Sequence, residues 1–330
     1  MIAAPEKLLE KLSKARVLVI GDLMLDHYLW GEVYRISPEA PVPVVHANRD
    51  TYTAGGAANV ALNLANLRVQ TSVLGHFAAD EAGRRLEKIL LENGVRIIEL
   101  PSTSEAPTII KTRVIVRNQQ LCRIDREYAR DLYRVDEAPG FEEKLTAVLD
   151  EVDAVIISDY AKGVITQPLI DMVIGRSLGS GRLLVSVDPK PSRKLNFRGA
   201  GLLTPNRSEA LELAGMPHIR QDEPYPLEEI CRRIAELYDP GLLIITLGAD
   251  GMVLYQQGKI VKHLLTEARE VYDVSGAGDT VIATLTAALA SGLDPAEAAW
   301  LANGAAGCVV AHIGTVPVKM NELQKWLENK

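Results

Sequence analysis

Near the C-terminal end, the stretch Asp273-Val-Ser-Gly-Ala-Gly-Asp279 combines a glycine turn with a carboxylate, between an expected strand over 270–272 and a long apolar helix. Gly276 and Gly278 allow the backbone to approach a ligand closely, and the amides that open the helix favour an anion. A carboxylate beside bound phosphate would be repelled unless it takes part in the reaction. Asp279 could take the proton from a hydroxyl that attacks a phosphoryl group. The alternative is that Asp279 is an ordinary helix N-cap.

Further polar residues follow apolar runs that we expect to form buried parallel strands. These runs cover 153–159, 183–188, 201–206 and 242–248. The carboxyl ends of parallel strands share one edge of a sheet, where ligands bind. Any one of these residues could be a turn or cap residue, whereas the convergence of six favours a site. The six are Asp159, Asp188, Asn206, Glu209, Thr246 and Asp279.

The N-terminal part supplies more candidate ligands. A buried strand over 16–21 ends at Asp22, and Asp26 follows; each carboxylate could accept hydrogen bonds from sugar hydroxyls, or Asp22 could simply form a turn. Small residues over 54–63 open a helix that carries Asn59 and Asn63 one turn apart, and Asn59 lies nearer the helix start. We therefore prefer Asn59 as a ligand.

Two segments, 28–50 and 108–125, alternate polar with aromatic or β-branched residues, which indicates exposed strands and turns outside the core. The second carries Lys111, Arg113, Arg117 and Arg123. A spacing of two places the first three on one face of a strand. Two interpretations stay open at this point: a solvated edge with positive charges, or a basic face for a substrate phosphate.

Composition limits the class of protein. The 330 residues are 47% hydrophobic and 24% charged, and the net charge of −7 gives no reason to expect nucleic-acid binding. The N-terminus lacks a signal-peptide pattern, and no apolar run is long enough for a membrane span. Cys122, Cys231 and Cys308 lie far apart, which predicts reduced, buried thiols rather than disulfides or a zinc site. We expect a cytoplasmic protein.

Gly55-Gly56 with Asn59, followed near the end by Asp273-x-x-Gly-Ala-Gly-Asp279, resembles the two signatures of the ribokinase-like (PfkB) carbohydrate kinases. The resemblance covers nearly the whole chain in the right order. It implies an α/β fold, a three-layer α/β/α core with a small β-sheet lid, as a single kinase domain over 1–330. The lid strands are implied at about 26–53 and 108–125, and the lid implies a homodimer because its exposed edges need to be covered.

The resemblance also implies roles for individual residues. Asp279 would be the base, and the amides of Gly276, Ala277 and Gly278 would bind the transferring phosphate. The sugar hydroxyls would be held by Asp26, Gly55, Gly56 and Asn59, and a substrate phosphate by Lys111 first and Arg123 second. Asn206 and Glu209 would act on Mg²⁺ and phosphate through water, and the ATP site would be lined by Thr246, Gly248, Gly251 and Asn303. Asp273 and Val271 match a monovalent-cation (K⁺) site, although Val274-Ser275 departs from the Thr-Thr pair of many relatives.

Finer motifs resemble one branch of the family, which phosphorylates O1 of D-glycero-β-D-manno-heptose 7-phosphate with ATP on the way to lipopolysaccharide core precursors. They include Gly21-Asp-Leu-Met-Leu-Asp26, Ser158-Asp-Tyr-Ala-Lys-Gly163 and Asp188-Pro-Lys190. In many bacteria this kinase is fused to a C-terminal adenylyltransferase, so the resemblance predicts a stand-alone kinase or an excised domain with a functional link to that enzyme.

Three alternatives remain. The substrate could be another sugar, such as fructose 1-phosphate, tagatose 6-phosphate or ribose, although the basic residues favour a phosphorylated one. A dinucleotide-dependent oxidoreductase is disfavoured because Val281 stands where its turn needs a third glycine, and no Walker lysine motif is present. A catalytically silent sugar-phosphate sensor is disfavoured by Asp279.

Overall fold

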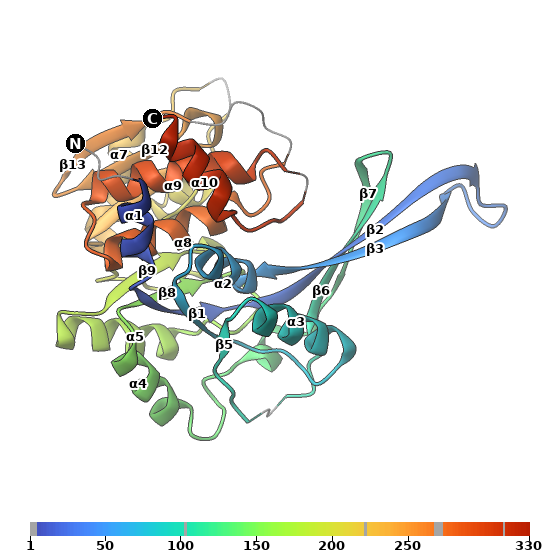
Figure 1. The fold of residues 1–330 in the computed structure, drawn as a ribbon, viewed down its shortest axis with the longest axis horizontal. Coiled ribbons are helices and arrows are strands. Elements are labelled where there is room, and N and C mark those ends of the chain that lie inside the picture. The colour runs from blue at the N-terminus through green and yellow to red at the C-terminus, as the bar shows by residue number, and fades with distance from the viewer. Residues whose placement is uncertain (1–4, 102–103, 221–222, 267–272, 313) are drawn as a thin grey trace.

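The computed structural model describes the 330-residue chain apart from residues 1–4, 102–103, 221–222, 267–272 and 313. Helices cover both faces of a large sheet, and a smaller sheet extends from one side of this body (Figure 1). The predicted three-layer α/β/α core with an additional small sheet is confirmed. The strand expected over 270–272 lies outside the described residues.

The large sheet comprises nine strands in the described part of the chain. Neighbouring strands pair in parallel except at one edge, where β12 is antiparallel to both β11 and β13. The central strands are apolar on both sides because both faces are covered. Val17 and Val19 of β1 enter one core, whereas Leu18 and Ile20 enter the other. Across the sheet the strands are β13 (Lys259–Leu264), β12 (Met252–Gln256), β11 (Leu242–Thr246), β10 (Leu202–Leu203), β9 (Leu184–Asp188), β8 (Ala154–Ser158), β1 (Arg16–Gly21), β4 (Gln70–Leu74) and β5 (Arg96–Ile97).

The helices divide between the two faces of this sheet. One core is formed with α1 (Pro5–Leu12), α2 (Ala57–Asn66), α3 (Glu81–Glu92), α8 (Ala277–Ala290), α9 (Pro295–Val309) and α10 (Met320–Glu328). The opposite core is formed with α4 (Phe141–Glu151), α5 (Gln167–Ser180), α6 (Arg207–Leu213) and α7 (Leu227–Tyr238). Short 3-10 helices are η1 (Arg130–Tyr133), η2 (Pro191–Arg193) and η3 (Gly248–Asp250).

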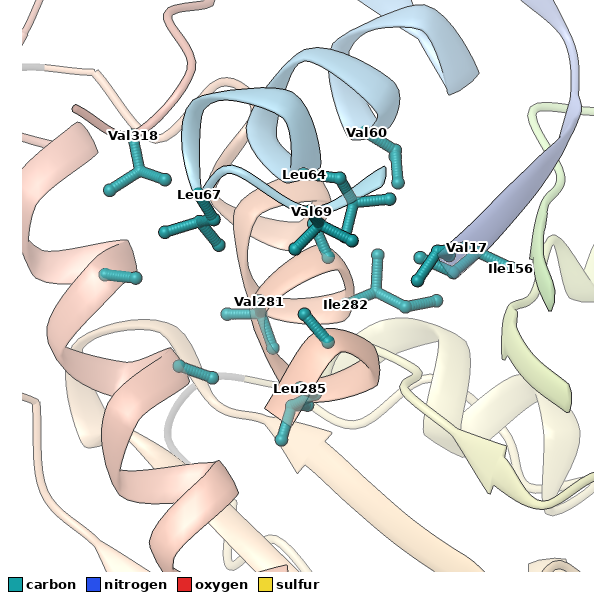
Figure 2. Packing of buried hydrophobic residues seen from close by; sticks show 14 of the residues in the cluster. Val17, Val60, Leu64, Leu67, Val69, Ile156, Val281, Ile282, Leu285 and Val318 are labelled. Atoms are coloured by element: carbon teal, nitrogen blue, oxygen red, sulfur yellow. The ribbon is translucent and has the colours of Figure 1, made fainter. Parts of the chain in front are cut away.

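The packing of α2 against α8 fixes where the two glycine-rich signatures meet. Figure 2 shows Leu64 of α2 and Ile282 of α8 on the side of the sheet to which Val17 and Ile156 also contribute, and all four side chains are fully buried. Burial of an aliphatic side chain of this size stabilises the fold by about 1.5–3 kcal/mol. Residues 220 positions apart, Asn59 and Asp279, are brought together by this contact.

The small sheet consists of β2 (Leu23–Ile36), β3 (Pro43–Gly56), β6 (Ile109–Val116) and β7 (Gln119–Arg126), in the order β3-β2-β6-β7. The β2–β3 hairpin begins directly after β1 and ends directly before α2, and its tip reaches far from the body (Figure 1). The bases of these strands therefore lie beside the starts of α2 and α8, whereas the tips are exposed.

Some expectations about this sheet were wrong. β6 ends at Val116, and Arg117 and Asn118 have φ values of 50° and 62°, so Arg117 belongs to the turn and does not share a face with Lys111. Cys122 is exposed, because β7 is an edge strand that is open to solvent along its whole length; Cys231 is buried and Cys308 is half-buried.

Within the described residues, none of the helices combines the length and apolarity that a membrane crossing requires.

Candidate active site

Asp279 is the third residue of α8 and is 3% exposed. The helix begins after Gly276, whose φ of 81° makes it the N-cap. The alternative that Asp279 is the N-cap is therefore wrong: its side chain leaves the helix end and faces residues from two other segments. A buried carboxylate in this position needs hydrogen-bond partners.

Both carboxylate oxygens of Asp279 accept a hydrogen bond. The Nδ2 group of Asn59 donates to Oδ2 at 2.7 Å, and the hydroxyl of Tyr160 donates to Oδ1 at 2.5 Å. Burial raises the pKa of Asp279 to about 6, against the opposing effect of these two donors. At neutral pH the group is mostly ionised but retains appreciable proton affinity, which is the condition a general base needs.

The glycine turn before Asp279 is shaped by close packing on one side only. A Cβ atom on Gly276 would lie 2.9 Å from Asn59 Nδ2, whereas one on Gly278 would meet nothing within 4 Å. Among described residues the amides of Gly276 and Gly278 have no hydrogen-bond partner, while the Ala277 amide donates to the Val274 carbonyl at 3.2 Å. Two of the three amides predicted to bind phosphate therefore have no partner in the part of the chain that the structure describes.

The base of the small sheet presents a row of polar side chains toward Asp279. Thr53, Asp26, Lys111 and Asp125 lie opposite one another on β3, β2, β6 and β7. The charges of Asp26 and Lys111 act on Asp279: Asp26 raises its pKa and Lys111 lowers it. Substrate that binds here would be held between this row and the start of α8.

Asp26, predicted to hold sugar hydroxyls, is 3% exposed and its Oδ1 accepts a hydrogen bond from Arg113 at 2.6 Å. Gly55 and Gly56 fit the surrounding backbone: a Cβ on Gly55 would lie 2.7 Å from Asp26 Oδ2, and one on Gly56 2.6 Å from the Asp22 carbonyl oxygen. The glycines are thus required by packing, and Arg113 is a functional candidate that we did not select from the sequence.

Two buried acceptors in this region lack a partner among the described residues, namely Asn59 Oδ1 and Thr53 Oγ1. Buried polar atoms without partners are rare, and each one calls for an explanation such as a bound ligand. Hydroxyl groups of a sugar are suitable partners for both. Thr53 was not selected from the sequence, since a threonine in a strand is too common to stand out.

The three cations of the basic face differ in how they are engaged. Arg113 is paired with Asp26, and Arg123 makes two hydrogen bonds to Asp125, at 2.8 and 2.9 Å. Lys111 forms no ion pair with any described residue, and its Nζ lies 5.5 Å from the ring centroid of Tyr160. Burial lowers the pKa of Lys111, while Asp26 partly opposes that shift. Lys111 is therefore the cation most available to an anionic ligand.

The residues predicted for nucleotide and Mg²⁺ lie beyond Asp279 along the sheet edge. Asn206 and Glu209 form a capping box at the start of α6, and Asn206 bridges to Thr246 at the end of β11. Gly248 begins η3 and Gly251 follows it, with φ values of 65° and 85°. Asn303 of α9 approaches the same group: its Nδ2 donates to the Leu265 carbonyl at 2.6 Å, and a Cβ atom on Gly251 would lie 2.8 Å from the carbonyl carbon of Leu265.

Negative charge gathers at this edge in a way that fits a divalent cation. Burial raises the pKa of Asp188 well above its usual range, and the charges of Glu209 and Asp279 add to the rise. The oxygens of Glu209 already contact Lys190 Nζ at 2.9 Å and the Asn206 amide at 3.1 Å. Mg²⁺ keeps several waters and takes few protein ligands. Contact between Glu209 and Mg²⁺ through water is compatible with this arrangement, and no group of three or more metal-binding side chains is found among described residues.

Asp273 lies before the glycine turn, and its two oxygens accept hydrogen bonds from the amides of Ser275 at 2.9 Å and Gly314 at 3.0 Å. Burial alone would raise its pKa, but these hydrogen bonds outweigh that effect and lower it, so the carboxylate is ionised. Val271, the other residue predicted at a monovalent-cation site, lies outside the described residues. The K⁺ site stays a prediction.

Asp22 is neither a sugar ligand nor a local turn former. Its fully buried carboxylate accepts hydrogen bonds from the amides of Tyr160 at 2.9 Å, Lys162 at 3.0 Å and Val164 at 3.0 Å. It thus anchors the loop after β8 that carries Tyr160. Tyr160 was missed as a site residue, although it lies in the motif Ser158-Asp-Tyr-Ala-Lys-Gly163 that carried the family resemblance.

Comparisons with solved structures support the fold. A putative ribokinase from Agrobacterium tumefaciens superposes with a TM-score of 0.75 at 19% identity, over 96% of this chain and 99% of that one. Phosphofructokinase-2 from Escherichia coli in complex with potassium gives a TM-score of 0.75 at 17% identity, also over 96% of this chain and 99% of that one. The chain therefore has the ribokinase-like fold.

Comparisons of sequence are closer. The D-beta-D-heptose 7-phosphate kinase of Bordetella bronchiseptica is 44% identical over 314 residues, or 95% of this chain and 96% of that protein. The bifunctional protein HldE of Citrifermentans bemidjiense is 42% identical over 320 residues, or 96% of this chain, which spans only 64% of that longer protein. Residues 14–321 match the pfkB family carbohydrate kinases. The match over most of its length shows that the chain belongs to the pfkB family of carbohydrate kinases.

Proposed function

We propose that this chain transfers the γ-phosphate of ATP to O1 of D-glycero-β-D-manno-heptose 7-phosphate in the cytoplasm. The observation that carries the reaction type is the buried carboxylate of Asp279 beside the free amides of Gly276 and Gly278. The sugar is supported by the name of the Bordetella bronchiseptica relative, with which this chain shares 44% identity over nearly its whole length. Lys111 forms no ion pair with any residue that the structure describes, which supports a phosphorylated substrate.

In the proposed reaction the O1 hydroxyl attacks the γ-phosphorus, its proton passes to Asp279, and the bond to the bridging oxygen breaks so that ADP leaves. Asn59 and Tyr160 hold the carboxylate in place. The free amides of the glycine turn bind the transferring phosphoryl oxygens, where negative charge must be stabilised. Mg²⁺ bound with the nucleotide would neutralise phosphate charge, with Glu209 acting on it through water. A K⁺ ion near Asp273 would support the same turn.

The small sheet has the position of a lid. Its polar row, which contains Asp26 and Lys111, faces Asp279 and would cover the sugar from the side opposite α8. Exclusion of water from such a site prevents hydrolysis of ATP and strengthens electrostatic interactions. We propose that strands over about 26–53 and 108–125 act in this way within a single kinase domain.

The test is ADP release from ATP·Mg²⁺ with a panel of acceptors: heptose 7-phosphate, fructose 6-phosphate, fructose 1-phosphate, tagatose 6-phosphate and ribose. We expect turnover to be dominated by heptose 7-phosphate. A preference for another acceptor would retain the role of Asp279 and refute the heptose assignment. If no acceptor is turned over while sugar phosphates still bind, the chain is a sensor rather than a kinase.

We further propose that the chain forms a homodimer through the small sheet. Exposed apolar side chains of this sheet include Tyr34 and Ile36 near the end of β2, and Ile124 nearer the base on the edge strand β7, which are 74%, 61% and 59% exposed. A partner that covers them would also protect the open strand edges. Sedimentation equilibrium should give twice the 36.0 kDa of one chain. Ile36→Glu should shift the protein to monomer, whereas Leu237→Glu on α7 should not; a wild-type monomer at micromolar concentration would contradict the proposal.

A link to an adenylyltransferase belongs to the same proposal. The chain covers 64% of the bifunctional relative, so that relative contains a substantial additional segment. The product of the proposed reaction would be a heptose 1,7-bisphosphate, and the phosphate on its O1 is the group to which a nucleotidyl group would later be attached. Enzymes that use this position must act after the kinase.

A further inference from the structure

We propose that Tyr160 is a positioning residue for the base of this kinase: its hydroxyl orients the Asp279 carboxylate and keeps it ionised over the working pH range. The inference rests on the proposed role of Asp279, but the hydrogen bond itself can be tested without turnover. The relevant contact is the 2.5 Å hydrogen bond from the Tyr160 hydroxyl to Asp279 Oδ1.

The loop that carries Tyr160 is held rigidly. The amide of Tyr160 itself, and those of Lys162 and Val164, all donate to the fully buried Asp22 carboxylate. The ammonium group of Lys111 lies 5.5 Å from the centroid of the Tyr160 ring. The phenol is thus fixed by its backbone, contacts the base with its hydroxyl, and has the predicted phosphate-binding cation near its ring.

Asn59 is the second donor to Asp279, and two donors are needed to fix the orientation of its carboxylate. Asn59 donates to Oδ2 and Tyr160 to Oδ1, so together they fix the plane of the carboxylate. Each oxygen retains a lone pair, and one of these can receive the proton of the attacking hydroxyl. Asn59 is fixed by α2, whereas Tyr160 comes from the opposite side of the sheet edge. Loss of Tyr160 would leave the carboxylate free to rotate about its last torsion.

The surroundings of Asp279 determine in which direction its pKa changes when the Tyr160 hydroxyl is lost. Among the described residues, the ionisable side chains that face Asp279 include Asp26 on β2, Lys111 on β6 and Asp188 at the end of β9. Burial raises the pKa of Asp279 to about 6, and the hydrogen bond from Tyr160 opposes that rise. Burial, followed by the charge of Asp279, raises the pKa of Tyr160 well above 10, so the phenol stays a donor throughout the working range.

Removal of the hydroxyl should therefore raise the pKa of Asp279 and move the acidic limb of the rate profile to higher pH. For Tyr160→Phe we expect kcat at about pH 6 to fall by about tenfold or more, and kcat at about pH 8.5 to fall by less than about fivefold. KM values for both substrates should change little. Tyr238→Phe, which removes a half-buried hydroxyl from α7, should leave the profile unchanged.

A second variant should shift the pKa of Asp279 in the opposite direction. Incorporation of 3,5-difluorotyrosine at position 160 makes the phenol a stronger donor without a change of shape, so the acidic limb should move to lower pH. A direct readout is the carboxylate band of Asp279 in infrared difference spectra of the free protein, identified by its loss in Asp279→Asn. The band should titrate at higher pH in Tyr160→Phe and at lower pH in the fluorinated protein. Titration that is the same in all three proteins would overturn the inference, whatever the panel shows about the substrate.

Discussion

Replacement of Asp279 by asparagine is expected to lower kcat by about 10²–10⁴-fold, because general-base assistance to the attacking hydroxyl is lost. The amide keeps the shape of the side chain and one oxygen that Tyr160 or Asn59 can donate to. KM for the sugar phosphate should therefore change little. Steady-state ADP release at saturating ATP measures both constants, and circular dichroism checks that the fold is retained.

A matched control is available on the neighbouring helix. Glu297 occupies the third position of α9, as Asp279 does in α8, but its side chain is exposed. Glu297→Gln should leave kcat close to the wild-type value. Near-wild-type turnover in Asp279→Asn would show that another group accepts the proton and would remove the basis of the proposed mechanism.

In the wild type, kcat should fall as the pH drops through about 6, since protonation of Asp279 removes the base.

The sheet and the position of the base could be predicted because they depend on local patterns. Apolar runs such as 154–158 and 242–246 form buried strands wherever both faces are covered, and the edge at their ends then collects polar residues. The glycine turn before Asp279 is likewise a local feature, since Gly276 needs a left-handed conformation.

The partners of the base could not be predicted, because they depend on contacts between distant segments. The hydrogen bond between Tyr160 and Asp279 joins residues 119 positions apart, and the anchor from Asp22 to the amide of Lys162 spans 140. Spacing in the sequence does not reveal which carboxylate will accept which donor. The same limit applies to Arg113. In the sequence it is one of several equivalent cations, and only the structure shows its ion pair with Asp26.

A difference in ion pairing separates the two cations predicted to bind the substrate phosphate, Lys111 and Arg123. Arg123 is 48% exposed and already held by Asp125, so an additional contact would be screened by solvent and would compete with this partner. Lys111 lies largely buried and forms no ion pair with a described residue. Loss of one partner from a desolvated charge pair costs about 2–5 kcal/mol, which is more than the median surface ion pair contributes.

We therefore expect Lys111→Met to reduce kcat/KM for heptose 7-phosphate by about 30-fold or more, and Arg123→Met by less than about tenfold. Arg117→Met, in the exposed turn of the same hairpin, is the control.

Comparison with unphosphorylated heptose then shows which phosphate Lys111 contacts. If Lys111 binds the 7-phosphate, the variant loses its preference for the phosphorylated sugar while turnover of the free sugar is retained. If Lys111 instead contacts the transferring phosphate, as its charge effect on Asp279 would allow, kcat falls equally for both sugars. A larger loss in Arg123→Met would reverse the order of the two cations, because the solvent-exposed pair would then have to open toward the ligand.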